Sequence, residues 1–310
     1  MPHRIAFLKP LCVAVSFFAS SVLPHAFSED FPSEGYRSLF DGESLAGWHA
    51  TPRLYVPNTE EFAKIPSSEL LEAVVKEHKE HSNATMREKV DNKGVWKVVD
   101  GAIEGGQVPG TVLGGYLMTD KKYGDFDLVF EAWPDFPIDT GIMVRAHEVG
   151  TVGFQILLDY RPNGNMGGVF GNGLGSFRAF PFVINGDEQP GFRVANLREG
   201  KLNRPQFKPE YAASVEDFLE AWKMDDWNTV RVRCVGRLPV IEVWINGVRI
   251  SKTDTSKLGE RVKGYDPDAV FERIGRKGHI ALEVHDSPNS RERWAPGAVC
   301  RWRNLRIVEL

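Results

Sequence analysis

The chain has 310 residues, of which 42% are hydrophobic, and a formal net charge of -4. Eight Trp and nineteen Phe can fill a sizeable core, which excludes a mainly disordered chain. The mild negative charge offers no basic surface of the kind that binds nucleic acid. The length suits one large domain or two small ones, and thirty Gly with nineteen Pro indicate many turns.

The first residues have the pattern of an export signal. Arg4 and Lys9 precede the apolar run PLCVAVSFFASSVLP, and residues 26–28, AFS, are suited to signal peptidase. We therefore expect residues 1–28 to be a signal peptide cleaved before Glu29, and the rest to be periplasmic or secreted. A membrane anchor is the alternative, but the run is shorter than the ~20 apolar residues that span a bilayer. No later segment is expected to span a membrane.

Most of the remaining chain alternates apolar and polar residues over short stretches. Asp100-Gly101 and Asn246-Gly247 each lie between two such stretches and predict tight hairpins. Further strands are predicted in FDLVFEAWP, TGIMVRAH, GFQILLDYR, NTVRVRCVG, GHIALEVHD and CRWRNLRIVEL. Many alternating strands with few helices favour a β-sandwich or a barrel.

Two helices are predicted between these strands. In SSELLEAVVKEHKEH the apolar residues, such as Leu70 and Val74, recur at helical spacing. Ser214 and Asp217 predict a capping box at the start of SVEDFLEAW. The sequence thus predicts an all-β fold with one or two short helical insertions.

The glycine-rich segment NGNMGGVFGNGLGSF is not predicted to bind phosphate. It has no Gly-Lys-Ser/Thr ending and no helical pattern follows it. We expect it to form tight turns that line a cleft, with Asn172 as a candidate substrate-binding residue.

Cys234 and Cys300 are the cysteines that remain after the signal peptide. Both lie in strand-like segments, VRVRCVG and AVCRWRN, and an exported protein can form disulfides. Two buried free thiols are the alternative, since cysteine is a common core residue. The sequence leaves the two open.

A series of short motifs follows the signal peptide in a fixed order: LFDGESLAGW, WKVVDGAI, GGYLMTDKKYGDFDL, TGIMVRA, DWNTVRVRCVG, INGVRI, GHIALEVHD and CRWRNLRI. In this order they resemble the 3-keto-disaccharide hydrolase family of exported bacterial proteins. The resemblance implies a concanavalin A-like jelly roll of two antiparallel sheets, formed by residues 29–310 as a single domain. By the same comparison, the helical stretch around residues 60–82 is an insertion. The chain departs from the family pattern at Gln155, Glu283 and Asp286, which replace Glu, Gln and Gly.

The resemblance also implies action on a sugar or oligosaccharide oxidised to a ketone at C3. The ketone acidifies the proton on C2, so that a base can remove it and expel the C1 substituent. Water can then add, which gives net hydrolysis. This chemistry needs a base with a pKa near the working pH and a cation beside the enediolate.

Strand alternation places candidate residues on shared faces. In GHIALEVHD, His279, Glu283 and His285 share a face, and if the face lies on the concave sheet it meets polar residues of two other strands. The resemblance therefore implies two sets of candidate residues. They are His285, Glu283, Arg145 and Asp159 for catalysis, and Gln155, Arg161 and Asn172 for substrate binding. A divalent metal ion held by Glu283, His285 and Asp159 is a further candidate, although no zinc motif is present.

Other interpretations remain open at this point. Arg145 and Asp159 could form a cross-strand ion pair with no chemical role. A non-catalytic carbohydrate-binding module would have the same fold. A glycosidase acting on unoxidised glucan would need paired carboxylates on one strand, and that motif is absent from the sequence.

Overall fold

The computed structural model describes residues 35–161, 164–182, 209–287 and 293–310. The predicted signal peptide, residues 1–28, lies outside these ranges. Ser33–Leu310 form one compact unit.

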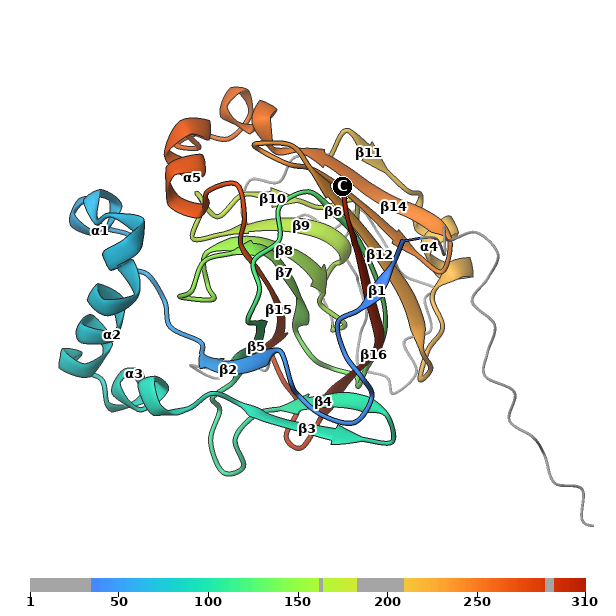
Figure 1. The fold of residues 1–310 in the computed structure, drawn as a ribbon, viewed down its shortest axis with the longest axis horizontal. Helices are drawn as coiled ribbons and strands as arrows, with labels where there is room; N and C mark the ends of the chain where they lie inside the picture. The colour runs from blue at the N-terminus through green and yellow to red at the C-terminus, as the bar shows by residue number, and fades with distance from the viewer. Residues whose placement is uncertain (1–34, 162–163, 183–208, 288–292) are drawn as a thin grey trace, which may run out of the picture. The chain divides into compact units, whose positions relative to one another are not determined.

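Two antiparallel sheets make up most of the described chain (Figure 1). In the larger, nine-stranded sheet, eight strands lie in one continuous order, and β1 (Arg37–Ser38) pairs separately with β16. That order is β11 (Tyr211–Ala212), β14 (Val248–Asp254), β13 (Val240–Ile245), β12 (Asn228–Val235), β6 (Phe126–Pro134), β16 (Val299–Glu309), β4 (Ala102–Gly106) and β3 (Val95–Val99).

The second sheet has seven strands among the described residues. Their order is β10 (Arg178–Ala179), β9 (Met166–Asn172), β8 (Gly153–Leu158), β7 (Thr140–Ala146), β15 (His279–Val284), β5 (Gly115–Thr119) and β2 (Trp48–Pro52). The two sheets pack as a jelly-roll sandwich, and the predicted fold class is confirmed.

The main core lies between the sheets, and strand alternation decides which residues enter it. On β7, Ile142 and Val144 point into this core, whereas Met143 points to the other side of the seven-stranded sheet. There it joins a smaller apolar cluster with Tyr116, Met118, Ala146 and Ala281. The seven-stranded sheet is therefore covered on both faces, and its outer face carries the polar residues described below.

The two predicted hairpins are confirmed. β3 pairs with β4 through Val99 and Ala102, and β13 pairs with β14 through Ile245 and Val248. Asp100 and Gly101 have φ angles of 49° and 75°, and Asn246 and Gly247 have 48° and 85°. Positive φ at both central positions is the requirement of a type I′ turn, which Asn or Asp followed by Gly satisfies at low cost.

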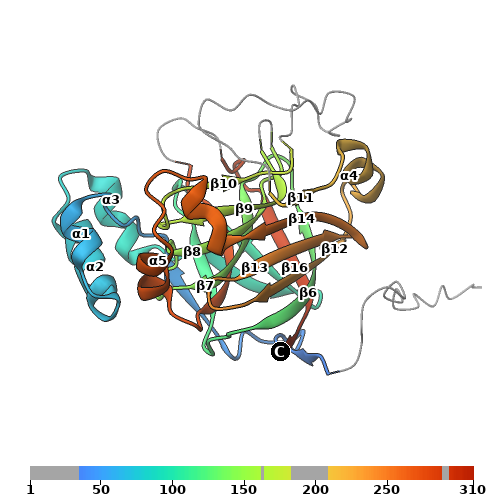
Figure 2. The same ribbon diagram turned by 90° about the horizontal axis from the view of Figure 1, so that it is seen from above.

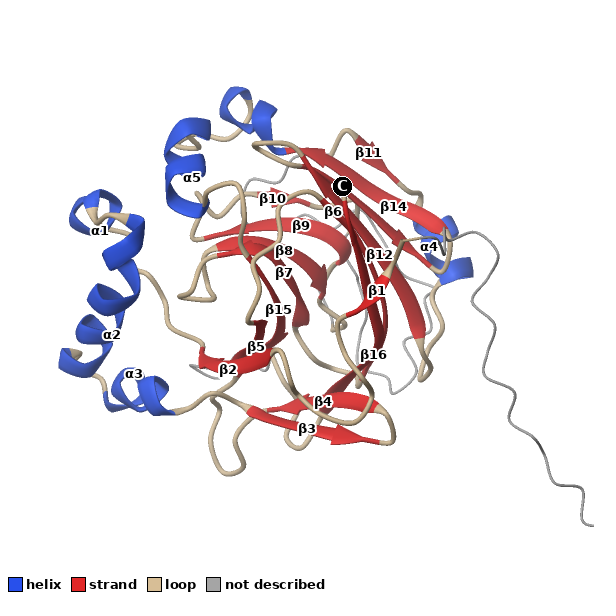
Figure 3. Cartoon of the chain, in the orientation of Figure 1, coloured by secondary structure: helices blue, strands red, loops and turns tan. Residues whose placement is uncertain are grey.

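The helices lie at the periphery of the sandwich (Figure 3). The predicted insertion contains α1 (Glu60–Lys64), η1 (Ser67–Glu69) and α2 (Leu70–Glu80), and helical structure continues through α3 (Ala84–Glu88) and η2 (Lys89–Asp91). The predicted capping box is present at α4 (Val215–Ala221). The sequence analysis missed η3 (Thr255–Glu260) and α5 (Pro267–Ile274), although Asp266 caps α5 and Pro267 opens it. No helix in the described ranges has the length and apolar character needed to cross a membrane.

The helices of the insertion lie beside the seven-stranded sheet, on the side away from the nine-stranded sheet (Figures 1 and 2). The face of α2 that carries Leu70, Val74 and His78 is buried. Because these side chains pack inward, the insertion is a fixed part of the wall over the outer face of the seven-stranded sheet.

Cys234 and Cys300 are free and buried, so the candidate disulfide is wrong and the alternative of two buried thiols is confirmed. β12 and β16 lie on opposite sides of β6. Cys234 lies opposite Phe126 and Cys300 opposite Pro134, at the two ends of that strand. Positions 126 and 134 of an extended strand are roughly 27 Å apart, whereas a disulfide needs Cα atoms within roughly 7 Å.

Candidate active site

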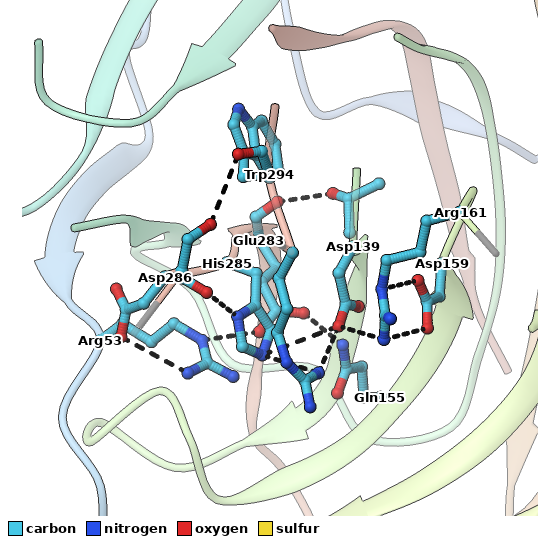
Figure 4. Close-up of polar contacts among 12 residues, drawn as sticks. Arg53, Asp139, Gln155, Asp159, Arg161, Glu283, His285, Asp286 and Trp294 are labelled. Atoms are coloured by element: carbon cyan, nitrogen blue, oxygen red, sulfur yellow. Dashed lines mark hydrogen bonds and ion pairs between the residues drawn. The ribbon is translucent and has the colours of Figure 1, made fainter. Parts of the chain in front are cut away.

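The candidate site lies on the outer face of the seven-stranded sheet, around Glu283 of β15 (Figure 4). Glu283 lies opposite Tyr116 on β5 and Gly141 on β7. A Cβ atom at Gly141 would lie 2.3 Å from the carbonyl oxygen of Ile156 and 3.4 Å from Cγ of Gln155. The absence of a side chain at Gly141 therefore lets Gln155 extend from β8 across β7 to Glu283.

The Glu283 carboxylate is fully buried and accepts hydrogen bonds at both oxygens. Nε of Arg53 donates to Oε1 at 2.9 Å, the Tyr116 hydroxyl donates to Oε1 at 3.0 Å, and Gln155 donates to Oε2. Burial raises the pKa of Glu283, and the charge of Arg53 opposes this shift. With three donors around it, Glu283 orients Arg53, Tyr116 and Gln155.

His285 follows the end of β15, and the backbone of Asp286 determines which of its ring nitrogens carries the proton. Nδ1 lies 2.6 Å from the backbone oxygen of Asp286. A carbonyl oxygen only accepts, so Nδ1 carries the proton and Nε2 carries a lone pair. Burial, with the charge of Arg53, lowers the pKa of His285 to about 3. The imidazole is therefore neutral at neutral pH.

Nε2 of His285 faces an arginine and a carboxylate. Nη1 of Arg293 lies 3.5 Å from Nε2, and Oδ2 of Asp139 lies 3.8 Å from it. The same Oδ2 accepts from Arg293 at 2.5 Å and from Arg161 at 3.3 Å. Burial disfavours the charged form of Asp139, but His285, which is protonated at the low pH where Asp139 titrates, together with Arg161 and Arg293, outweighs burial and lowers the pKa of Asp139 to about 2. Asp139 is thus an anion that holds two arginines beside the imidazole.

Asp159 lies one residue beyond β8, and Arg161 connects it to Asp139. Nε of Arg161 lies 2.7 Å from Oδ1 of Asp159, and Nη2 donates to Oδ2 at 2.9 Å. Burial and the nearby charge of Asp139 raise the pKa of Asp159, and Arg161 opposes this shift. Of the two carboxylates, Asp159 is therefore the one that takes up a proton first as the pH falls.

Asp286 anchors the backbone that fixes His285. Its Oδ1 accepts from the backbone N–H of Gly114 at 2.8 Å, and its Oδ2 accepts from Tyr55 at 3.2 Å and from Lys89. Lys89 and Asp286 are both buried, so this ion pair ties η2, which follows the insertion, to the segment that follows β15. The Asp that replaces the family's Gly thus makes contacts that glycine lacks.

The structure brings most of the predicted site residues together. Glu283 and Gln155 share a hydrogen bond, and Asp159 and Arg161 connect to His285 through Asp139. These residues come from β15, β8 and the segments that follow them, as the shared-face argument predicts.

Arg145 is a correction. Its side chain is fully buried, away from this group, where Nε donates to Gly124 and Nη2 pairs with Asp125 at 2.9 Å. The pairing of β15 with β7 shifts register here, because His279 lies opposite Ala146 while Ala281 lies opposite Met143. The extra residue on β7 is a bulge, and Arg145 has a φ of 51°. The bulge removes Arg145 from the face of Met143.

His279 and Asn172 lie away from His285. His279 lies at the other end of β15, where Nδ1 donates to the backbone oxygen of Thr119 at 2.6 Å. Asn172 ends β9, opposite Gly153. It lines a cavity between the helical insertion, α5 and the turn after β9.

The residues proposed as metal ligands do not fit a metal ion. Arg53, Tyr116 and Gln155 occupy the Glu283 oxygens, and Arg161 occupies both oxygens of Asp159. Among the described residues, no group of three or more His, Cys, Asp or Glu side chains is arranged to hold a metal. We assign no step to a metal.

Sequence reasoning missed Arg53, Asp139 and Arg293. Arg53 directly follows β2, and Asp139 directly precedes β7. Asp139 directly precedes the predicted strand TGIMVRAH, which was the available signal for it, whereas the strand before Arg53 was not predicted. Arg293 carried no strand signal, since it lies in the connection between β15 and β16.

Comparison with solved structures gives distant likenesses. A candidate glycosyl hydrolase from Parabacteroides distasonis is 16% identical, with a TM-score of 0.45, and the match covers 89% of this chain and 94% of that chain. A Bacillus subtilis protein with a galectin-like fold is 10% identical, with coverages of 70% and 86% and a TM-score of 0.41. The β-glucanase of Bacillus licheniformis is 12% identical, with coverages of 72% and 84% and a TM-score of 0.38. No curated protein matches the sequence.

Family models give a definite result. Residues 35–308 match the model described as the 3-keto-alpha-glucoside-1,2-lyase-like domain. The match covers nearly all of the chain and confirms the resemblance seen in the short motifs. The chain therefore belongs to the family of the 3-keto-alpha-glucoside-1,2-lyase-like domain.

Proposed function

We propose that the protein is an exported enzyme that cleaves 3-keto-glycosides by removing the C2 proton and expelling the C1 substituent. The observation that carries the proposal is the neutral imidazole of His285, whose Nε2 lone pair lies beside Arg293 and Asp139. Family membership supports the substrate class.

The elimination needs no further reactant, and the later hydration consumes one water molecule. The base takes the proton from C2, and the electron pair of that bond forms an enediolate with the C3 ketone. The enediolate collapses, the C3 ketone forms again, a C1–C2 double bond appears, and the C1–O bond breaks. The departing oxygen takes up the proton, which gives a 2-hydroxy-3-ketoglycal and a free alcohol or sugar. Addition of water across the double bond gives the 3-keto sugar, for net hydrolysis.

His285 is the base in this proposal. Burial and the nearby guanidinium groups keep the imidazole neutral before substrate binds. An enediolate beside those groups offsets their charge, so the imidazole becomes a stronger base as the anion develops. The imidazolium can then return its proton to the departing oxygen.

Arg53 and Arg293 stabilise the anion. Nε of Arg53 is held by Glu283, and Nη1 by Tyr55, while in the described part of the chain no hydrogen bond uses Nη2. Arg293 is held by Asp139 at 2.5 Å. Both guanidinium groups are positioned before substrate arrives, which is the requirement for stabilising charge that forms in the transition state.

The test is to incubate the purified protein with a 3-keto-disaccharide and with the same disaccharide unoxidised. We expect a free sugar and the ultraviolet absorbance of the enone from the oxidised substrate, and no product from the other. Deuterium at C2 of the hydrolysed sugar, when the reaction is run in D₂O, would establish elimination followed by hydration. Binding of the oxidised sugar without any product would favour the carbohydrate-binding module instead.

A further inference from the structure

A cavity of about 560 Å³ lies between β2, the helices α2 and η2, and the turn that joins β7 to β8. This volume falls within the range of roughly 300–1,000 Å³ that small-molecule sites occupy. The apolar residues that line it include Leu54, Leu71, Val75, Val90 and Val149. His279, at the start of β15, also lines it and has no part in the proposed reaction.

The cavity is separate from the polar group of the candidate active site. Neither Glu283 nor His285 lines it. The turn after β7 contacts the cavity through Val149, and the next residue, Gly150, packs against Tyr116. A Cβ atom at Gly150 would lie 2.6 Å from Cδ2 of Tyr116. A molecule in the cavity therefore meets side chains that the proposed reaction does not use.

His279 offers a hydrogen-bond acceptor to this cavity. Its Nδ1 lies 2.6 Å from the backbone oxygen of Thr119, which only accepts, so Nδ1 carries the proton and Nε2 carries a lone pair. His279 is 5% exposed, and its Nε2 is buried with no hydrogen-bond partner among the described residues. Burial lowers the pKa of His279, which favours the neutral ring. A buried acceptor without a donor costs free energy, so Nε2 is suited to a ligand that donates a hydrogen bond.

The charged groups of the cavity stand at its rim. Lys93, Glu148 and His49 line the cavity and are exposed, whereas His279 is the buried polar residue of the lining. Glu148 already pairs with Lys122 at 2.9 Å. A charged group moved into the apolar interior would lose its hydration without gaining a buried partner of opposite charge. The interior is therefore suited to an uncharged ligand.

We propose that this cavity binds a small uncharged molecule that has an apolar body and one hydroxyl group, and that the hydroxyl donates to Nε2 of His279. The apolar body would cover Leu71, Val75 and Val90, which removes their surface from water. A sugar fits the same lining poorly, because most of its hydroxyls would face apolar side chains without a partner. The site is therefore a second one, for a ligand of a different class from the substrate.

The experiment compares p-cresol with p-xylene, two molecules of nearly equal shape that differ by a hydroxyl in place of a methyl group. Dissociation constants for the purified protein come from ligand-observed NMR titrations. We expect the wild type to bind p-cresol more tightly, because p-xylene leaves Nε2 of His279 without a donor. In protein with isotopically labelled histidine, p-cresol should move the Nε2 signal of His279 upfield, and p-xylene should leave it in place.

Three variants locate the site. His279→Leu removes the acceptor and should lower the ratio of p-cresol affinity to p-xylene affinity by about three- to tenfold. Leu71→Trp fills the cavity and should abolish measurable binding of both compounds. Lys76→Trp adds the same bulk at an exposed position of α2, outside the cavity, and should bind both compounds as the wild type does.

Four results would overturn the proposal. They are a wild type that does not bind p-cresol, equal wild-type affinity for the two compounds, an unchanged ratio in folded His279→Leu, and wild-type binding in Leu71→Trp. If His279→Leu does not fold, the nitrogen signal of the wild type decides, and an unmoved Nε2 signal at saturating p-cresol would overturn the proposal as well. Cleavage of 3-keto-glycosides is measured separately, so these results leave the proposed function in place.

Discussion

At the scale of single residues, His285 combines the contacts that a base needs. The backbone oxygen of Asp286 holds the proton on Nδ1, and the side chain of Asp286 is itself held by Gly114 and Lys89. The orientation of the imidazole is therefore set by the main chain that follows β15 and by Lys89 of η2. Nε2 lies 3.5 Å from Nη1 of Arg293 and 3.8 Å from Oδ2 of Asp139, and it is the atom that acts on the substrate in the proposed function.

We expect His285→Gln to lower kcat by at least ~10²-fold, the typical contribution of a general base, with a smaller effect on KM. The Gln amide can still donate to the Asp286 carbonyl, so the melting temperature should remain close to that of the wild type. Steady-state kinetics and thermal unfolding of the two proteins measure both quantities. A His285→Gln enzyme with wild-type turnover would remove His285 from the mechanism.

His279 provides the matched control on the same strand. It is buried at the other end of β15, with Nδ1 bonded to Thr119. We expect His279→Gln to change stability more than turnover of the folded enzyme. An equal loss of turnover in the His279 and His285 variants would show that histidines on β15 matter through packing.

The lowered pKa of His285 also predicts a dependence of stability on pH. Its pKa is about 3 in the folded protein and about 6.5 in the unfolded chain. Between these values the unfolded state binds a proton that the native state does not. The free energy of unfolding therefore falls as the pH decreases through this window, by up to about 1.4 kcal/mol per pH unit from this one group.

The His285→Gln variant has no imidazole at this position, so its free energy of unfolding does not decrease through protonation there. Relative to wild type, we expect the variant to become progressively more stable as the pH is lowered from roughly 7 to roughly 4. Urea unfolding of both proteins across this range measures the difference. A difference in unfolding free energy that stays constant with pH would contradict the buried, neutral imidazole.

At the scale of elements, the bulge in β7 decides the role of Arg145. The bulge turns Arg145 toward Asp125, the Gly124 carbonyl and the Gly236 carbonyl. Regular alternation in TGIMVRAH placed Arg145 with Met143, and the sequence carries no signal for the extra residue on β7. The error at Arg145 is therefore an error of register.

We expect Arg145→Ala to destabilise the protein by about 3 kcal/mol, because it breaks a buried ion pair and leaves two carbonyls without their partner. Arg276→Ala is the control. Arg276 pairs with the same Asp125 at 2.5 Å, but its side chain is 51% exposed, so its loss should cost no more than about 1 kcal/mol. Chemical denaturation gives both values, and kcat of the folded Arg145 variant should match the wild type. A large loss of kcat in that variant would return Arg145 to the site.

At the scale of the whole molecule, the two sheets and the insertion gather the site from distant parts of the chain. Arg53 and Glu283 are hydrogen-bonded although they are 230 positions apart, and Lys89 and Asp286 are 197 positions apart. Arg53 precedes the insertion and Lys89 follows it, so these contacts join the segments on both sides of the insertion to Glu283 and Asp286.

Export is a further prediction for the whole chain. When the full chain is expressed in a bacterium with a signal peptidase, we expect the mature protein to begin at Glu29, outside the cytoplasm. Mass spectrometry of the periplasmic and secreted fractions would identify the terminus. Intact residues 1–28 on protein retained in the cytoplasm would show that this segment is no export signal.

Local patterns in the sequence determined many of the strands, the hairpins at Asp100-Gly101 and Asn246-Gly247, and most of the insertion, but they missed β9, which lies in the glycine-rich segment expected to form turns. These depend on side-chain periodicity and on φ preferences, which neighbouring residues set. The same periodicity placed Glu283 on the outer face of its strand, and that face proved to carry the polar group.

The tertiary structure alone decided what surrounds His285. Asp139, Arg53 and Arg293 come from the edges of different strands and from a connection, and no local pattern relates them to β15. It also decided that Cys234 and Cys300 stay apart, because β6 lies between their strands. Strand order and register depend on which apolar faces pack together across the entire fold, so they follow from contacts between distant residues and not from any single segment.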